Sequence, residues 1–330
     1  MQNSDLESHG TTGDTTWDTI IIGGGVAGLS AALMLGRARR RVLVIDAGQP
    51  RNRFATHMHA VLGHEGIDPA ELLRIGRADA SAFGVDFADA SVTRVEDLSE
   101  DQGSGNLTVN TDDGTSYSTR SLILATGITD RLPDIPGLAE HWGTSVLHCP
   151  YCHGWEVRDR RLGVLATSPM ALHQVQLLRQ WSDDVVFFAG LAGPLDDATR
   201  ARLRARDIRI VDQLVVEVLG DGVDVTGVRL ADDTVIDVGA IFTGGFPEPH
   251  DRMLEPLHLD RTDGPMGNAI AVDPMGRTSD PRVWAAGNVI NPAANVPVAM
   301  GAGSMAGAAV NAALVTQEFD AAVAHTAVRS

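Results

Sequence analysis

The sequence has very little cysteine and no long apolar run. Only two of its 330 residues are cysteines, whereas a secreted domain held together by disulfides has several at wide spacing. Its longest apolar stretches, such as Thr19–Gly23 and Leu122–Thr126, have the length of β-strands. A membrane-spanning helix needs roughly 20 apolar residues. We therefore expect neither a disulfide scaffold nor a membrane protein.

Basic residues are also scarce. The chain has 26 lysines and arginines against 43 acidic residues, which gives a formal net charge of -17. Such a charge repels nucleic acid and anionic lipid, so neither is an expected partner. Residues Met1–Thr16 are polar and lack the basic start and apolar core of a secretion signal. We interpret them as a disordered tail and expect a cytoplasmic protein.

The N-terminal part follows a strand, turn, helix, strand pattern. The β-rich run Trp17–Ile22 leads into the turn Gly23–Gly28, and Leu29–Arg37 then carries apolar residues at helical spacing. A second strand at Arg41–Ile45 closes on an aspartate. This pattern is typical of a nucleotide-binding βαβ unit.

The turn has the spacing Gly23-x-Gly25-x-x-Gly28, with Ala27 inside it. In this motif the first glycine permits a tight turn, the second lets the backbone approach a pyrophosphate, and the third lets helix pack on strand. Asp46 lies where an acid would accept hydrogen bonds from ribose hydroxyls. The alternative is a glycine-rich turn without a ligand. We favour a dinucleotide site at the helix N-terminus.

A second strand, helix, strand pattern covers Leu162–Ala166, Met170–Trp181 and Asp184–Ala189, after a proline-rich linker at Arg131–Gly137. A helix dense in alanine and glycine is predicted at Ala299–Val315. We expect an α/β protein with two nucleotide-binding, Rossmann-like domains, the second inserted into the first. The expected limits are a tail at 1–16, the first domain at 17–128 and 246–330, and the inserted domain at 129–245.

Between these patterns the signals are local. The sequence predicts a helix from Asp68 to Phe83 with Asp68 as its N-cap, and a loop-rich stretch at Phe246–Asp280. Short strands are predicted at Val92–Asp97, Leu107–Asn110, Ser116–Ser118 and Ser121–Ala125.

The two cysteines form the segment Cys149-Pro150-Tyr151-Cys152. Two thiols at this spacing can close a disulfide when the second begins a helix, and such motifs lower a thiol pKa to ~3.5–7 from ~8.5. The thiolate is the nucleophile in exchange. The alternative is half of a zinc site, with His148 and His153 nearby. No second cysteine pair exists, so we favour redox chemistry and expect no metal.

The two flanking histidines can take a proton from a thiol and hold the thiolate as an ion pair. For a single histidine, a polar surface role is the usual alternative. We favour His153, which directly follows Cys152, over His148.

The order of these motifs resembles that of the low-molecular-weight thioredoxin reductases, over about Trp17–Val315. The matching segments are Gly23–Gly28, Asp46, Ala125-Thr126-Gly127, the cysteine pair and Ala286-Gly287-Asn288. The resemblance implies FAD bound by the N- and C-terminal segments, a dithiol on the inserted domain, and a homodimer.

The resemblance also implies roles for individual residues. Cys152 would lie against the flavin and Cys149 would exchange with substrate, while His153 stands where the reductases commonly have an acid/base aspartate. Asn288 stands where they usually have aspartate. The residues implied at FAD are Gly23, Gly25, Ala27, Gly28, Asp46, Arg51, Asn52, Ala125, Thr126, Gly127, Gly287, Asn288, Asn295 and Val296.

Two of these assignments depend on their surroundings. Arg51-Asn52 resembles a flavin-side loop, although arginines there could also be solvated. Asn295-Val296 precedes the last predicted helix, whose N-terminal dipole would stabilise a reduced, anionic flavin.

The inserted domain departs from the reductase pattern. The reductases bind NADPH there through a glycine-rich turn and a basic cluster. Here the turn reads Ala166-Thr167-Ser168-Pro169-Met170, without glycine, and the next strand ends Phe187-Phe188-Ala189-Gly190, without Arg or Lys. We expect that this domain does not bind NADPH. The alternative is a degenerate but working site.

The segment His148–Glu156 resembles the branch that oxidises small-molecule dithiols, which includes the enzymes that close the disulfides of gliotoxin and holomycin. It implies electron flow from a dithiol to the enzyme disulfide, to FAD and to O2, giving H2O2. Two alternatives remain: a disulfide reductase fed by NADPH or ferredoxin, and a flavin redox sensor without turnover. Gly244–Pro247 and His250 are candidates for the substrate opening, or form an ordinary interdomain loop.

Overall fold

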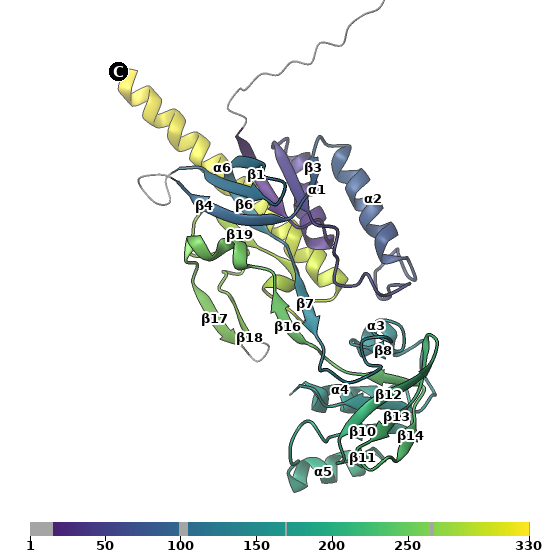
Figure 1. Cartoon of the computed structure of the whole chain (residues 1–330). Helices are drawn as coiled ribbons and strands as arrows, with labels where there is room; N and C mark the ends of the chain where they lie inside the picture. Colours follow the sequence, from purple (N-terminus) through teal and green to yellow (C-terminus); the bar gives the residue numbers. More distant parts are fainter. Residues whose placement is uncertain (1–15, 99–104, 169, 265–266, 330) are drawn as a thin grey trace, which may run out of the picture.

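The computed structural model describes residues 16–98, 105–168, 170–264 and 267–329, and shows two lobes (Figure 1). One lobe contains the N- and C-terminal segments and the other is built from the middle of the chain. The expected tail lies outside the described residues, except for Thr16.

The first lobe is built on a sheet with the strand order β3-β2-β1-β6-β5-β4, in which β19 also pairs with β6. Strands β1, β2, β3, β6 and β19 are parallel, and β4 and β5 extend the sheet in antiparallel fashion. The elements are β1 (Trp17–Ile22), α1 (Val26–Arg37), β2 (Val42–Asp46), α2 (Pro69–Ser81), β3 (Asp86–Asp89), β4 (Val92–Asp97), β5 (Leu107–Thr111), β6 (Ser116–Leu124) and β19 (Val283–Ala285).

Most predicted elements of this lobe are present, and Asp68 caps α2 by accepting from the amides of Ala70 and Glu71. The prediction of separate strands at Ser116–Ser118 and Ser121–Ala125 was wrong, because both belong to the single strand β6. Thr119, in the presumed gap, pairs with Trp17 on one side and Leu107 on the other. These two ladders keep the backbone extended.

The last helix, α6 (Val296–Arg329), is much longer than the predicted Ala299–Val315. Its first half packs closely on α1, since a Cβ at Gly303 would lie 1.9 Å from the Ala27 carbonyl oxygen. The small-residue pattern of that contact ends near Leu314, the last buried side chain, while the helix continues exposed. The predicted range covers only the residues that pack on α1, and therefore leaves out the exposed C-terminal half of α6.

The length and composition of α6 bear on the expectation that no segment could cross a membrane. By these two criteria alone, the stretch Val296–Ala327 would be able to do so, and about a third (33%) of its most apolar window is buried inside the protein. This stretch does not stand out in the sequence as a long apolar run, because glycine, serine and asparagine interrupt its apolar residues. A helix packed in the core of a soluble protein meets the same criteria, so length and composition alone do not identify a membrane-spanning helix.

The second lobe is built on a parallel sheet of order β11-β10-β9-β15-β8, with a separate antiparallel sheet β12-β13-β14. Helix α5 was not predicted because it has no apolar stripe, with Leu203 its only buried residue. The elements are β8 (Val146–Leu147), α3 (Pro150–His153), β9 (Leu162–Leu165), α4 (Ala171–Leu178), β10 (Val185–Phe188), α5 (Asp197–Arg204), β11 (Arg209–Val211), β12 (Val215–Asp221), β13 (Asp224–Leu230), β14 (Val235–Asp237) and β15 (Ala240–Phe242).

A two-stranded ribbon joins the lobes (Figure 1). It pairs β7 (Ile128–Arg131) with β16 (Phe246–Pro249) in antiparallel register. The expected domain boundaries, at 128/129 and 245/246, fall at this ribbon and remain predictions. The stretch predicted as loop-rich also contains a 3-10 helix and a hairpin, at Arg252–Leu257, β17 (Arg261–Gly264) and β18 (Gly267–Ile270).

Candidate active site

A cavity of about 520 Å³ is lined by residues of both lobes. Its size falls in the range of small-molecule sites, ~300–1,000 Å³. All the predicted catalytic and FAD-binding residues line it except Gly28. The motifs, far apart in the sequence, therefore converge on one space.

The glycine turn after β1 has the geometry expected of a phosphate cradle. Gly23 has φ +103°, and a Cβ there would lie 2.5 Å from the Ala125 carbonyl oxygen. A Cβ on Gly28 would lie 1.9 Å from the Gly23 carbonyl oxygen, so Gly28 allows helix packing and does not reach the cavity. Gly25 has no atom within 4 Å of its Cβ position, which leaves space for a ligand. The N-terminus of α1 has no side-chain cap, so its amides are available to a phosphate.

Two further segments extend the cradle. Asp46, at the end of β2, lies so close to the turn that a Cβ on Gly24 would be 2.6 Å from its Oδ2. Residues Ala125, Thr126 and Gly127 follow β6, at the carboxyl ends of the parallel strands, where open α/β sheets bind ligands. His250 does not line the cavity.

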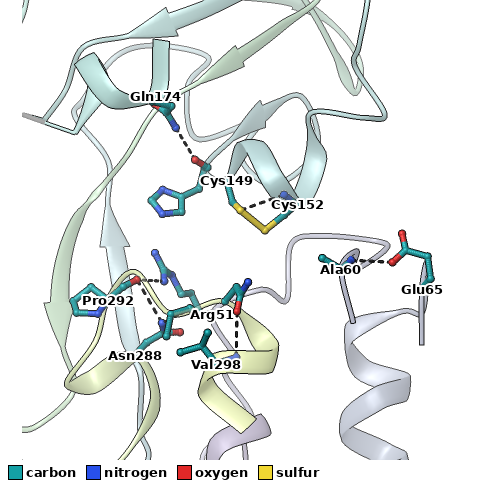
Figure 2. The surroundings of a disulfide bond; sticks show 12 residues. Arg51, Ala60, Glu65, Cys149, Cys152, Gln174, Asn288, Pro292 and Val298 are labelled. Carbon is teal, nitrogen blue, oxygen red and sulfur yellow. Dashed lines mark hydrogen bonds between the residues drawn. A yellow bond between two sulfur atoms is a disulfide. The ribbon is translucent and has the colours of Figure 1, made fainter. Parts of the chain in front are cut away.

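Arg51 is not solvated. Its Nε and Nη2 donate to the two carboxylate oxygens of Asp130, each at 2.7 Å, and its Nη1 donates to the Pro292 carbonyl at 2.8 Å (Figure 2). The two side chains are only 18% and 6% exposed. Arg51 thus joins the loop after β2 to the ribbon and to the segment before α6. It shapes the cavity wall, with most of its donors already engaged.

The side-chain amides of two asparagines fix the segment before α6 and the start of that helix. Asn288 Nδ2 donates to the carbonyls of Asn291 and Ala294 at 3.1 and 2.9 Å, which an aspartate could not do. Asn295 caps α6 by accepting from the Val298 amide at 3.2 Å. The helix therefore begins at Val296 with its N-terminus at the cavity, where its dipole favours negative charge.

The cysteines form a disulfide that faces this segment (Figure 2). The expectation that the second cysteine begins the helix was wrong. Pro150 is the first residue of α3 and Cys149 is its N-cap, because proline is favoured at the first helical position. The Cys152 amide donates to the Cys149 sulfur at 3.2 Å. This hydrogen bond would stabilise Cys149 as a thiolate in the reduced pair.

Both flanking histidines line the cavity. Burial lowers the pKa of His153, and the positive charge of His59 lowers it further while Glu156 opposes this. Burial also lowers the pKa of His148, assisted by the charge of Arg51. Neutral imidazoles at neutral pH can accept a thiol proton. Among the described residues, the buried His148 Nδ1 has no hydrogen-bond partner.

Sequence reasoning missed His59, which lines the cavity with its ring centroid 6.4 Å from that of His153. It also missed Phe54 and Tyr151, which form an apolar rim at the cavity mouth with Phe246 of the predicted substrate opening; the three are 47%, 66% and 68% exposed. No local pattern distinguishes these residues from ordinary loop positions. Only the approach of the two lobes brings them together.

The described residues of the turn after β9 are arranged differently from those of the glycine turn. Thr167 Oγ1 lies 2.8 Å from Thr243 Oγ1 and donates to the Gly244 carbonyl at 2.6 Å, which fastens the turn to the end of β15. After β10, a Cβ on Gly190 would lie 2.6 Å from the Gln213 carbonyl oxygen, so the backbone there is tightly packed. In the part of the chain that the structure describes, no cluster of three or more His, Cys, Asp or Glu could hold a metal ion.

The fold and this site define a disulfide oxidoreductase of the two-domain α/β type, which confirms the predicted fold class. The chain belongs to the pyridine nucleotide-disulphide oxidoreductase family, which it matches over residues 17–303. It is a thioredoxin reductase-like flavoprotein, and FAD is its cofactor. The glycine cradle and the open space at Gly25 fit that cofactor.

Individual relatives cover almost the whole chain. The crystal structure of HlmI superposes with a TM-score of 0.90 at 42% identity, over 97% of this chain and 99% of that one. An oxidoreductase from Agrobacterium tumefaciens gives 0.85 at 39% identity, over 92% and 99%. Thioredoxin reductase tcpT from Claviceps purpurea is 33% identical over 88% of this chain and 92% of its own length.

Proposed function

We propose that the protein oxidises a small-molecule dithiol to a disulfide, with O2 as the final electron acceptor and H2O2 as the second product. The main support for this proposal is the difference between the turn after β1 and the turn after β9. The turn after β9 is fastened by Thr167 and has no glycine, while the disulfide lies in a cavity lined by both lobes. We infer that NADPH does not bind at that turn and that a dithiol supplies the electrons.

The cofactor is assigned to the segments that form the cradle. Gly23, Gly25 and the N-terminus of α1 would hold the pyrophosphate, and Asp46 the ribose. Gly287 and the N-terminus of α6 would hold the remainder of the FAD molecule. When bound, FAD would take the two electrons of the reduced cysteine pair and pass them on to O2.

The chain's own residues perform the thiol exchange. A substrate thiolate attacks Cys149 Sγ, the bond to Cys152 breaks, and Cys152 leaves as a thiol by taking up a proton. The second substrate thiolate then attacks the substrate sulfur of the mixed disulfide and releases a cyclic disulfide with Cys149 as the leaving group. His153 accepts the thiol protons and returns them to the reduced pair. The net reaction is dithiol plus O2 to disulfide plus H2O2.

The cavity mouth favours a compact, largely apolar substrate. The exposed rings of Phe54, Tyr151 and Phe246 form its rim, and Gly244–Pro247 line the cavity as well. A net charge of -17 would repel an acidic protein donor such as ferredoxin. The proposal includes a homodimer, which light scattering would detect as twice the mass of one chain.

An anaerobic titration of the flavin tests the proposal. A small dithiol should bleach the flavin absorbance, NADPH should not, and admitted air should restore the flavin with one H2O2 per disulfide. Cys152→Ser should keep FAD but lose bleaching by dithiol. Immediate bleaching by NADPH would identify a reductase. A single bleaching that air does not reverse would identify a sensor.

A further inference from the structure

His59 connects the two lobes at the redox site. It lies in the loop between β2 and α2 of the first lobe, yet its ring packs edge to face with that of His153, at an interplanar angle of 85°. Its Nε2 lies 3.5 Å from Oε1 of Glu156, just beyond α3. The side chain is only 19% exposed. His59 therefore faces the group that we assign as the base.

Glu65 fixes the position of His59. The Nδ1 of His59 lies 2.7 Å from Glu65 Oε1, and Glu65 Oε2 accepts from the Ala60 amide at 2.9 Å (Figure 2). The hydrogen bond from His59 lowers the pKa of Glu65. Ala60 has φ +60°, a left-handed conformation that a non-glycine residue adopts only when its surroundings hold it there. The loop is thus built around this pair.

The charged groups around His153 act in opposite directions. Burial is the largest cause of its lowered pKa, and the charges of His59 and His148 lower it further. Glu156 is the group that raises the pKa of His153. His59 and Glu156 also contact each other, so neither can change without affecting the balance at His153.

We propose that His59 and Glu156 are positioning residues that act in opposition on His153, and so set the lowest pH at which the protein oxidises a dithiol. The inference rests on the proposed function, because it takes His153 as the acceptor of the substrate's proton. His153 accepts a proton only when neutral, so the rate should rise with pH along an acid limb. A charge added or removed beside His153 moves that limb.

The test is the rate at which dithiothreitol bleaches the flavin anaerobically, measured in the full chain over roughly pH 5 to 9, where histidines titrate. His59→Gln removes a positive charge, so the limb should move to higher pH by roughly half a unit or more. Glu156→Gln removes a negative charge, so the limb should move to lower pH by a similar amount. His64→Gln, an exposed neighbour outside the cavity, should leave the limb in place.

Opposite shifts would support the inference, since a purely structural role would lower the rate at every pH without moving the limb. Shifts in the same direction, or no shift in either variant, would overturn it. His153→Asn separates this result from failure of the proposed function. If the limb vanishes in His153→Asn but does not move in the other two variants, only the inference fails. If the limb persists in His153→Asn, His153 is not the base and the inference fails, whereas the proposed function fails only if dithiothreitol does not bleach the flavin of the unmodified protein.

Discussion

The two lobes repeat one local design, a parallel strand followed by a turn and a helix, but only the turn after β1 is rich in glycine. After β1, Gly25 leaves open space and Gly23 adopts a positive φ. In the turn after β9, Thr167 instead bonds to Thr243 and Gly244. The same backbone frame can therefore serve as a nucleotide site or as a plain wall, and a few side chains decide which.

The largest effect should come from Gly28→Ala. The new Cβ would lie 1.9 Å from the Gly23 carbonyl oxygen, so α1 would have to shift away from the turn. We expect a loss of about 3 kcal/mol in unfolding free energy, with most of the bound FAD lost. Flavin absorbance per mole of protein and urea denaturation measure both. Ser168→Gly, in the other turn, is the matched control and should keep its FAD. A fully loaded Gly28→Ala protein would remove the distinction between the turns.

Asp46→Asn should have the next largest effect. It keeps the shape of the side chain but removes the charge that strengthens hydrogen bonds to ribose hydroxyls. A loss of about 1.4 kcal/mol would weaken FAD binding about tenfold. Titration of the apoprotein with FAD measures this, with Asp86→Asn, an exposed aspartate of β3, as the control. Unchanged affinity would mean that Asp46 does not contact the cofactor.

The comparison also shows which parts of the fold a sequence reveals. The strands β1, β4 and β9 and the capped helix α2 were predictable, because a short stretch of chain determines them. Helix α5 was not, since half of its residues are charged and it buries only Leu203. The exposed end of α6 was also missed, because no packing pattern marks it.

The candidate site divides in the same way. The glycine turn and the cysteine pair could be found from spacing alone. The ion pair of Arg51 with Asp130 and the contact of His59 with His153 could not, because each joins residues far apart in the chain. From the sequence alone, Arg51 could be either a flavin-loop residue or a solvated one, and no sequence pattern identified Asp130 as its partner.

Thr167→Val should have a smaller effect, confined to the second lobe. It removes the hydrogen bonds to Thr243 and Gly244, at a cost of about 1–2 kcal/mol. The melting temperature should fall by a few degrees, roughly 2–4 °C per kcal/mol for a chain of this size, with FAD content unchanged. Ser168→Ala is the control in the same turn. A loss of flavin in Thr167→Val would show that the two turns are coupled.

The smallest expected effect is that of NADPH. Excess NADPH should leave the anaerobic flavin spectrum unchanged in the natural protein and in Ser168→Gly, because Ser168→Gly leaves Pro169 in the turn and adds no Arg or Lys at the end of β10. Isothermal titration of each protein with NADPH gives an independent measurement. Heat of binding in Ser168→Gly alone would mean that one glycine suffices to restore a cradle.

The ribbon of β7 and β16 has a mechanical consequence. The two strands that join the lobes are tied to each other by the hydrogen bonds of an antiparallel pair. Arg51 locks the base of the ribbon through Asp130, in a place too buried for salt to screen well. Because Arg51 and Asp130 also line the cavity, a rotation of one lobe about this ribbon would change the shape of the cavity wall.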